Sequence, residues 1–193
     1  LEDRAEQLKK VVYQEKLGTS YEKMERFKAI AVFLAEKLCS DKKESVEKTA
    51  YLCKADLLSE MVYEFPELQG VMGYYYAKNE GLDDDIARGI MEHYLPKFAG
   101  DVLPETEEGR LTSIADKIDT IAGVFAAGMK PTGNLDPYGL RRNAIGIISI
   151  IEQAGYRIEL KDIINITFDK LSSRLTFDKD TVMQEVLSFI NLR

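Results

Sequence analysis

The sequence is poor in the residues that catalytic and metal-binding sites most often use. Its 193 residues include one histidine, two cysteines and no tryptophan. Catalytic triads, zinc sites and histidine phosphorelays all need a histidine, so each of them would depend on His93 alone. Cys39 and Cys53 both fall inside helical patterns, which favours buried thiols in a reducing cytoplasm over a disulfide or a zinc site.

Long apolar runs are absent as well. No stretch approaches the roughly 20 apolar residues that a membrane-spanning helix needs, and no signal peptide is visible. The composition, 45% hydrophobic and 31% charged, is that of an ordinary globular protein large enough to bury a core. We therefore expect a cytoplasmic protein with no membrane partner. Because the chain opens at Leu1 and ends within a helical pattern, we interpret it as a piece of a longer polypeptide.

The net charge of −7 is unevenly distributed. Residues 1–55 carry 12 basic and 10 acidic side chains, residues 56–119 carry 5 and 15, and residues 120–193 carry 9 and 8. The acidic excess therefore lies in the middle third. A nucleic-acid partner would have to dock on a basic surface elsewhere.

The hydrophobic periodicity predicts helices almost throughout. The expected segments are 1–17, 19–39, 43–64, 66–81, 83–95, 110–128, 140–155, 161–173 and 179–193. Thr19 and Glu22 form a capping-box pattern, and Pro66 suits the first turn of the helix that it opens. Only the stretch YRIEL, residues 156–160, hints at a strand. The sequence thus predicts an all-α bundle of eight or nine helices.

His93 has two interpretations. It lies at the end of an expected helix, where an imidazolium would favour the last carbonyl groups or the ring would simply pack. The alternative is a lone metal ligand.

Three aspartates form the other candidate set. Asp116 and Asp119 are three residues apart on one helical face, and Asp56 lies in an earlier helix. Such carboxylates could hold a divalent cation or perform acid–base chemistry. They could equally accept hydrogen bonds from arginines or from helix N-termini.

The layout of Asp56 and Asp116 in a helical bundle resembles the HD phosphohydrolase superfamily. In that superfamily histidines, a His-Asp pair and a distant aspartate hold a metal that activates water. Here Ala55-Asp56 stands where His-Asp is expected, and residues 25–37 contain no histidine. Two carboxylates alone lack the binding strength of imidazole. The resemblance therefore implies a single HD-like helical domain over residues 1–193 without a metal or catalytic residues, with leading helices (1–40), a core (41–154) and C-terminal helices (155–193).

Other motifs suggest contacts with phosphates or bases. The stretches EFPELQGVMG and GMKPTGNLDPYG match no nucleotide-binding fingerprint, so their glycines fit tight turns better. Three consecutive tyrosines, 74–76, could stack on bases but point in three directions on a helix. Arg141 and Arg142, near a helix start and close to Lys130, suit a phosphate backbone, or else pair with Asp136 or Asp119.

Several long strings resemble the bacterial glycyl-tRNA synthetase β subunit. They are VVYQEKLGTSYEKMERFKAIA (11–31), KADL (54–57), EFPELQG (64–70), MGYYYA (72–77), EHYLPKFAGDVLP (92–104), ADKIDT (115–120) and PTGNLDPYGLRRNAIGI (131–147). Together they cover most of the chain, and the likeness is to the internal HD-like domain of that subunit.

This resemblance implies a non-catalytic domain of a glycine–tRNA ligase that helps to position tRNA(Gly). The α subunit would activate glycine with ATP and magnesium, and the two subunits would form an α2β2 heterotetramer. Lys130, Arg141 and Arg142 are then candidate tRNA contacts, and this domain itself needs no cofactor. An active metal-dependent phosphohydrolase and a pure interdomain scaffold remain the alternatives.

Overall fold

The computed structural model describes residues 1–133 and 135–192, so Asn134 of the motif PTGNLDPYG lies outside the described part. The described residues form ten α-helices, four short 3-10 turns and one two-stranded hairpin. The predicted all-α class is confirmed. None of the helices in the described part is both long and apolar enough to cross a membrane.

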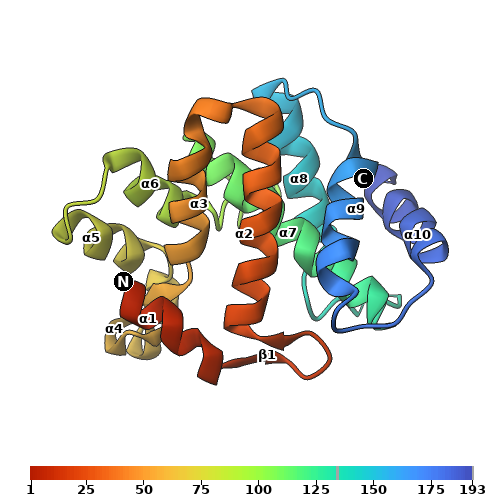
Figure 1. The fold of residues 1–193 in the computed structure, drawn as a ribbon, viewed down its shortest axis with the longest axis horizontal. Coiled ribbons are helices and arrows are strands. Elements are labelled where there is room, and N and C mark those ends of the chain that lie inside the picture. The colour runs from red at the N-terminus through yellow and green to blue at the C-terminus, as the bar shows by residue number, and fades with distance from the viewer. Residues whose placement is uncertain (134, 193) are drawn as a thin grey trace.

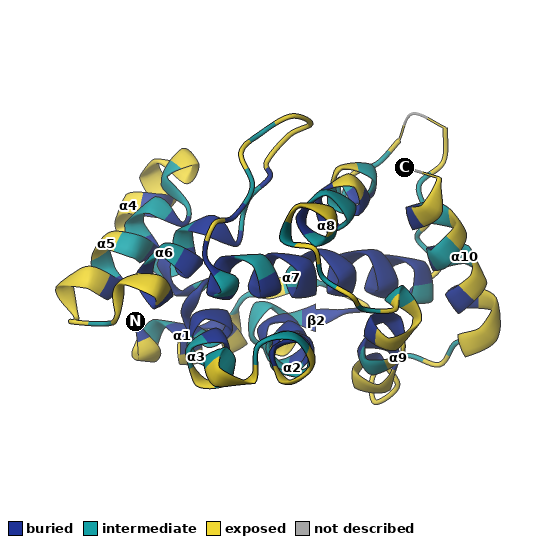
Figure 2. Cartoon of the chain, turned by 90° about the horizontal axis from the view of Figure 1, so that it is seen from above, coloured by how far each residue is buried: buried dark blue, intermediate teal, exposed yellow. Residues whose placement is uncertain are grey.

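Helix α7 (Glu107–Ala126) is the centre of the fold (Figure 2). Sixteen of its twenty residues are buried, so the helix is covered on all sides rather than on a single stripe. Its neighbours include α2 (Ser20–Leu38), α3 (Lys43–Leu52), α6 (Asp84–Glu92) and α8 (Leu140–Ala154). The last two helices, α9 (Leu160–Leu171) and α10 (Lys179–Asn191), pack at the opposite end from α4 (Glu60–Glu64) and α5 (Val71–Asn79) (Figure 1).

The start of α2 has the hydrogen bonds of a capping box. The Thr19 hydroxyl accepts from the Glu22 backbone N–H, and the Glu22 carboxylate accepts from the Thr19 backbone N–H at 2.7 Å. These two hydrogen bonds satisfy donors that a helix start leaves free. The capping box predicted from the sequence is confirmed.

The segment before α2 was predicted wrongly as one helix over residues 1–17. Helix α1 covers only Glu2–Gln7, and the chain then forms strands β1 (Val12–Gln14) and β2 (Gly18–Thr19), which pair antiparallel. Gly18 has a φ of +94°, a conformation that glycine adopts without the steric cost paid by other residues. The residues directly before Gly18 therefore belong to a short hairpin and not to one face of a helix.

The predicted helix over residues 43–64 is also interrupted. Helix α3 ends at Leu52, a 3-10 turn covers Ala55–Leu58, and α4 starts at Glu60. The segment 66–81 likewise divides into a 3-10 turn, Pro66–Leu68, and α5. These breaks raise the number of α-helices above the predicted eight or nine. Residues 156–159 form no strand.

The two thiols behave as the composition indicated. Cys53 is buried and Cys39 is half-buried, and both are free. Burial raises the pKa of the Cys39 thiol to about 11, so the group stays protonated at neutral pH.

Candidate functional site

The carboxylate of Asp119 is fully buried between α7 and α2. Arg26 donates to it through two nitrogens, Nε to Oδ1 at 2.8 Å and Nη2 to Oδ2 at 3.1 Å. The remaining guanidinium nitrogen, Nη1, donates to the Leu17 carbonyl oxygen at 3.0 Å. This bidentate pair uses Asp119 as an anchor between helices, as the interpretation with an arginine partner predicted.

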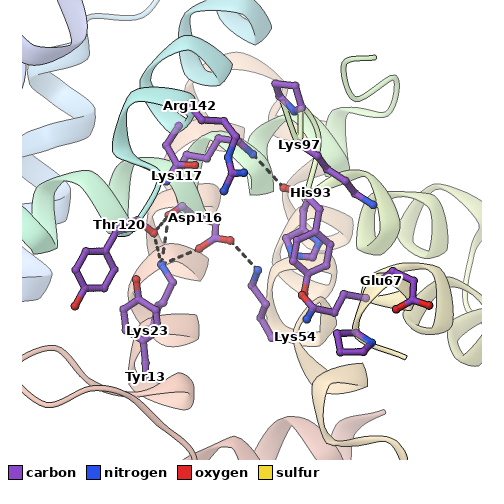
Figure 3. A pocket seen from close by; sticks show the side chains of 16 residues that line it. Tyr13, Lys23, Lys54, Glu67, His93, Lys97, Asp116, Lys117, Thr120 and Arg142 are labelled. Atoms are coloured by element: carbon purple, nitrogen blue, oxygen red, sulfur yellow. Dashed lines mark hydrogen bonds and ion pairs between the residues drawn. The ribbon is translucent and has the colours of Figure 1, made fainter. Parts of the chain in front are cut away.

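Asp116, one helical turn earlier, faces two lysines. Lys23 Nζ lies 2.8 Å from Oδ1, and Lys54 Nζ lies 2.8 Å from Oδ2, so the two ammonium groups flank one carboxylate (Figure 3). Burial alone would raise the pKa of Asp116, but the two lysines outweigh it and hold the pKa well below 3.8. Asp116 is therefore ionised at any physiological pH.

Asp56 does not join Asp116. Its buried Oδ2 accepts from the backbone N–H groups of Gly70 at 2.6 Å and Gly73 at 3.0 Å. Burial raises the pKa of Asp56, and these two hydrogen bonds oppose that rise. Ala55 beside it is buried and offers only a methyl group. The side chain that reaches Asp116 from this segment is the preceding Lys54.

The contacts of Asp56 also explain the motif EFPELQGVMG. Gly70 has a φ of +80°, and a Cβ there would lie 2.8 Å from Tyr94 Cδ2. A Cβ on Gly73 would lie 2.6 Å from Ile90 Cγ2 and 3.2 Å from Asp56 Oδ2. Both positions need glycine so that their amides can reach the carboxylate. The motif therefore fixes backbone packing, in line with the tight-turn interpretation.

His93 is buried at the C-terminal end of α6. Its Nδ1 lies 2.6 Å from the Ile90 carbonyl oxygen, which can only accept, so Nδ1 carries the proton. Burial, assisted by the nearby Lys54 charge, lowers the pKa well below 6.5 and keeps the imidazole neutral. The ring thus packs and satisfies a helix-end carbonyl, but as a neutral group rather than as the imidazolium considered above.

These residues do not fit a metal. Both oxygens of Asp116 are held by ammonium groups, which would repel a divalent cation, and Asp56 is turned toward backbone amides. Within the described residues no group of three histidine, cysteine or carboxylate side chains is placed to hold an ion. Two lysine ammonium groups therefore flank Asp116, where the resemblance to HD phosphohydrolases would place a cation.

A cavity of about 520 Å³ opens beside this cluster, and we call it the Asp116 cavity. Its charged lining is mostly cationic, with two carboxylates, Asp116 and Glu67, against five cations: Lys23, Lys54, Lys97, Lys117 and Arg142 (Figure 3). Tyr13, Tyr94 and Tyr138 supply aromatic walls. An arrangement of this kind suits an anion.

The three cations proposed to contact tRNA are not gathered at one place. Lys130 pairs with Glu185, and Arg141 Nη2 donates to the Gly133 carbonyl oxygen at 2.5 Å. Both line a second cavity of about 500 Å³ next to α10. Arg142 instead lines the Asp116 cavity. The predicted pairing of the arginines with Asp136 or Asp119 is wrong.

Asp136 and Asp119 have other partners. The Asp136 carboxylate caps α8 by accepting from the backbone N–H groups of Leu140 and Arg141, and Asp119 is taken by Arg26. The tyrosines at 74–76 diverge as expected for a helix: Tyr75 is 60% exposed, while Tyr76 packs against the Arg4 guanidinium. Tyr74 and Tyr75 meet edge to face, with ring centroids 5.2 Å apart and planes at 76°, so the three rings share no common plane.

Sequence reasoning missed the lysines. Lys54 stands beside Ala55-Asp56 and Lys117 beside Asp116, so adjacency to the suspected site was an available signal. Lys23 gave none, because it lies 93 residues before Asp116. Its side chain also donates to the Thr120 hydroxyl at 2.8 Å.

Comparison with known proteins agrees with the resemblance noted in the sequence. The family model described as glycyl-tRNA synthetase beta subunit matches residues 1–193. Proteins named glycine–tRNA ligase beta subunit from Trichlorobacter lovleyi, Geobacter sulfurreducens and Syntrophotalea carbinolica are 52%, 53% and 50% identical over all 193 residues. The chain spans 28% of the length of each of these relatives. A match along every residue at this identity shows that the chain belongs to the glycyl-tRNA synthetase beta subunit family.

Proposed function

We propose that this chain is a non-catalytic part of a glycine–tRNA ligase, where it supports ATP-dependent attachment of glycine to tRNA(Gly). The similarity to glycine–tRNA ligase beta subunits along the whole chain supports the reaction. One observation carries the non-catalytic role: lysine ammonium groups hold both oxygens of Asp116. A hydrolytic HD site would need a metal there to activate water.

The partners follow from the same proposal. An α subunit would bind ATP and magnesium and activate glycine, and the two kinds of subunit would assemble as an α2β2 heterotetramer in the cytoplasm. This chain would then contribute surface for tRNA and packing for its own subunit.

The tRNA contacts are proposed on the segment that leads into α8. Lys130, Arg141 and Arg142 lie within thirteen residues of one another, and the two arginines are in the first turn of α8. The Arg142 side chain is exposed and makes no ion pair within the described residues, so it is free to meet a phosphate. Lys130 and Arg141 contact protein groups, the Glu185 carboxylate and the Gly133 carbonyl oxygen, which a phosphate would have to displace.

A charge-reversal experiment tests this proposal. In the enzyme reconstituted with its α subunit, Arg141→Glu with Arg142→Glu should abolish aminoacylation, because two phosphate contacts become repulsive. Glycine-dependent exchange between ATP and pyrophosphate should remain, because it needs no tRNA. Lys161→Glu, an exposed cation at the start of α9, is the matched control. Unchanged charging by the double variant would remove both arginines from tRNA binding.

A scaffold role is a second candidate, favoured by exposed aromatic residues. Tyr63, within α4, is 83% exposed, and Phe65, directly after the last residue of α4, is 50% exposed. Apolar side chains left in solvent at one place are typical of an interface. Crosslinking of tRNA to the assembled enzyme separates the two roles: adducts on this chain support tRNA positioning, and adducts confined to other parts of the enzyme support the scaffold.

A further inference from the structure

The Asp116 cavity is positive in a protein whose net charge is −7. Five cationic side chains line it against two carboxylates, and one of these, Glu67, is exposed at its rim. Asp116 is shared between Lys23 and Lys54, and Asp119, the second carboxylate near Lys23 at 3.3 Å, is already bound by Arg26, so the two carboxylates do not neutralise all three cations. A cavity wall of this sign concentrates anions.

Three of these cations lack a carboxylate partner. Lys117 is buried and donates only to neutral oxygens, those of Leu95 at 2.9 Å, Ser113 at 2.6 Å and His93 at 3.4 Å. Arg142 and Lys97 make no side-chain hydrogen bond or ion pair within residues 1–133 and 135–192. Leaving a buried cation without a counter-charge is costly, and burial accordingly lowers the pKa of Lys117 to about 7. An anion placed in the cavity would remove that cost.

A buried hydroxyl gives a second, independent indication. Tyr94 lines the cavity, and its Oη atom is inaccessible to solvent and has no hydrogen-bond partner among the described residues. Buried hydroxyls nearly always have a partner, so an unpartnered one calls for a ligand or another polar group. The Lys54 ammonium lies 4.1 Å from the centre of the same tyrosine ring, which holds the ring at the cavity wall.

The chemistry of these groups selects the ligand class. Ammonium and guanidinium groups only donate, so the ligand must be rich in acceptor oxygens. A phosphate offers several such oxygens and matches the fork of an arginine. The cavity volume of about 520 Å³ exceeds the space needed for one phosphate, and Tyr13 and Tyr138 leave flat apolar walls for a ring.

We propose that the Asp116 cavity binds the phosphate group of a small phosphorylated molecule, held by Arg142, Lys97 and Lys117 without any metal. Inorganic phosphate and a nucleoside monophosphate share this chemistry. The site is proposed to bind the ligand and not to hydrolyse it, because two lysines hold Asp116 and the described residues place no group of three metal-ligating side chains to activate water. Phosphate binding at this site requires neither tRNA nor a partner subunit, although Arg142 is shared with the proposed tRNA contacts.

Calorimetric titration of the intact protein tests the site, with a chelator present throughout. Inorganic phosphate, AMP and adenosine serve as the three probes. Phosphate and AMP should bind and adenosine should not. Tighter binding of AMP than of phosphate would assign the aromatic walls to the base, and equal binding would assign the site to phosphate alone. Absence of binding by both anions at millimolar concentration would overturn the proposal.

Matched variants show whether binding occurs in this cavity. Arg142→Gln and Lys97→Gln change exposed side chains, so the fold should survive, and each should weaken phosphate binding about tenfold. Lys161→Gln removes an exposed charge from α9, outside the cavity lining, and should leave binding unchanged. An equal loss in all three variants, or in none, would contradict the assignment. Failure here with intact tRNA charging would leave the proposed function standing.

Discussion

Two cationic regions of this protein use the same residue types for opposite purposes. Around Asp116, Lys23 from α2 and Lys54, which follows the end of α3, both form ion pairs with one carboxylate. At residues 129–143, an arginine remains exposed without an ion pair in the described part of the chain. A buried charge without a partner costs free energy, whereas an exposed charge can stay in water unpaired. Charge that looks functional in the sequence is therefore structural in the first region and free in the second.

The sharpest way to break this comparison is to remove the anion of the buried region. Asp116→Asn leaves Lys54 without a counter-charge and leaves Lys23 only the Asp119 carboxylate at 3.3 Å, which Arg26 also binds, so the free energy of unfolding should fall by about 3–5 kcal/mol. Urea denaturation measures the change. As control, Asp85→Asn removes an exposed carboxylate from Lys42 and should cost less than about 1 kcal/mol. Equal losses would show that the Asp116 region is not special.

A second change tests how firmly the backbone beside the cluster is fixed. Gly70→Ala places a Cβ 2.8 Å from the Tyr94 ring at a φ of +80°, so we expect a loss of about 2–4 kcal/mol. Gly81→Ala has a similar φ of +77° with nothing within 4 Å, and should lose only about 1 kcal/mol. Because the two glycines share a backbone conformation, the difference in thermal unfolding between the variants measures the cost of crowding against Tyr94. A Gly70→Ala variant no worse than the control would mean that Tyr94 moves freely.

The sequence predicted the all-α class because helix periodicity and end signals are local. The Thr19–Glu22 capping box and the C-terminal helices appear close to their predicted positions. The break after α3 was not predictable, because it follows from Asp56 binding the amides of Gly70 and Gly73, a tertiary contact. The division of the domain at residues 40 and 154 stays a prediction.

The candidate site was half-predictable for a related reason. The missing imidazoles are visible in the composition, and so is the weakness of two carboxylates as metal ligands. The pairing of Asp116 with two lysines is not visible there, because it needs Lys23 and Lys54 to meet Asp116 in space. Arg141 and Arg142 are adjacent in sequence yet line different cavities, which only the structure shows.

The pH dependence of stability offers a further comparison. The folded-state pKa of Asp116 is depressed, so its contribution is complete above the unfolded pKa of about 3.9 and is lost as pH falls through the folded value. Asp56 acts in the opposite direction, because its pKa is raised by burial. Urea titrations between about pH 5 and pH 3 should show a shallower loss of stability in Asp116→Asn than in the parent. An unchanged slope would mean that Asp116 is not the titrating group.

The smallest effect on stability belongs to the exposed region. Arg142→Gln removes no ion pair within the described residues, so its free energy of unfolding should stay within about 0.5 kcal/mol of the parent. Its effect should appear in tRNA binding instead. The slope of log affinity against log salt concentration should become shallower by the amount expected for about one phosphate contact. Lys130→Gln is the informative companion, because Lys130 is paired with Glu185 and must leave it to reach a phosphate. If the salt dependence of tRNA binding falls more in Lys130→Gln than in Arg142→Gln, the comparison is reversed. The paired Lys130, and not the unpaired Arg142, would then be the contact with tRNA.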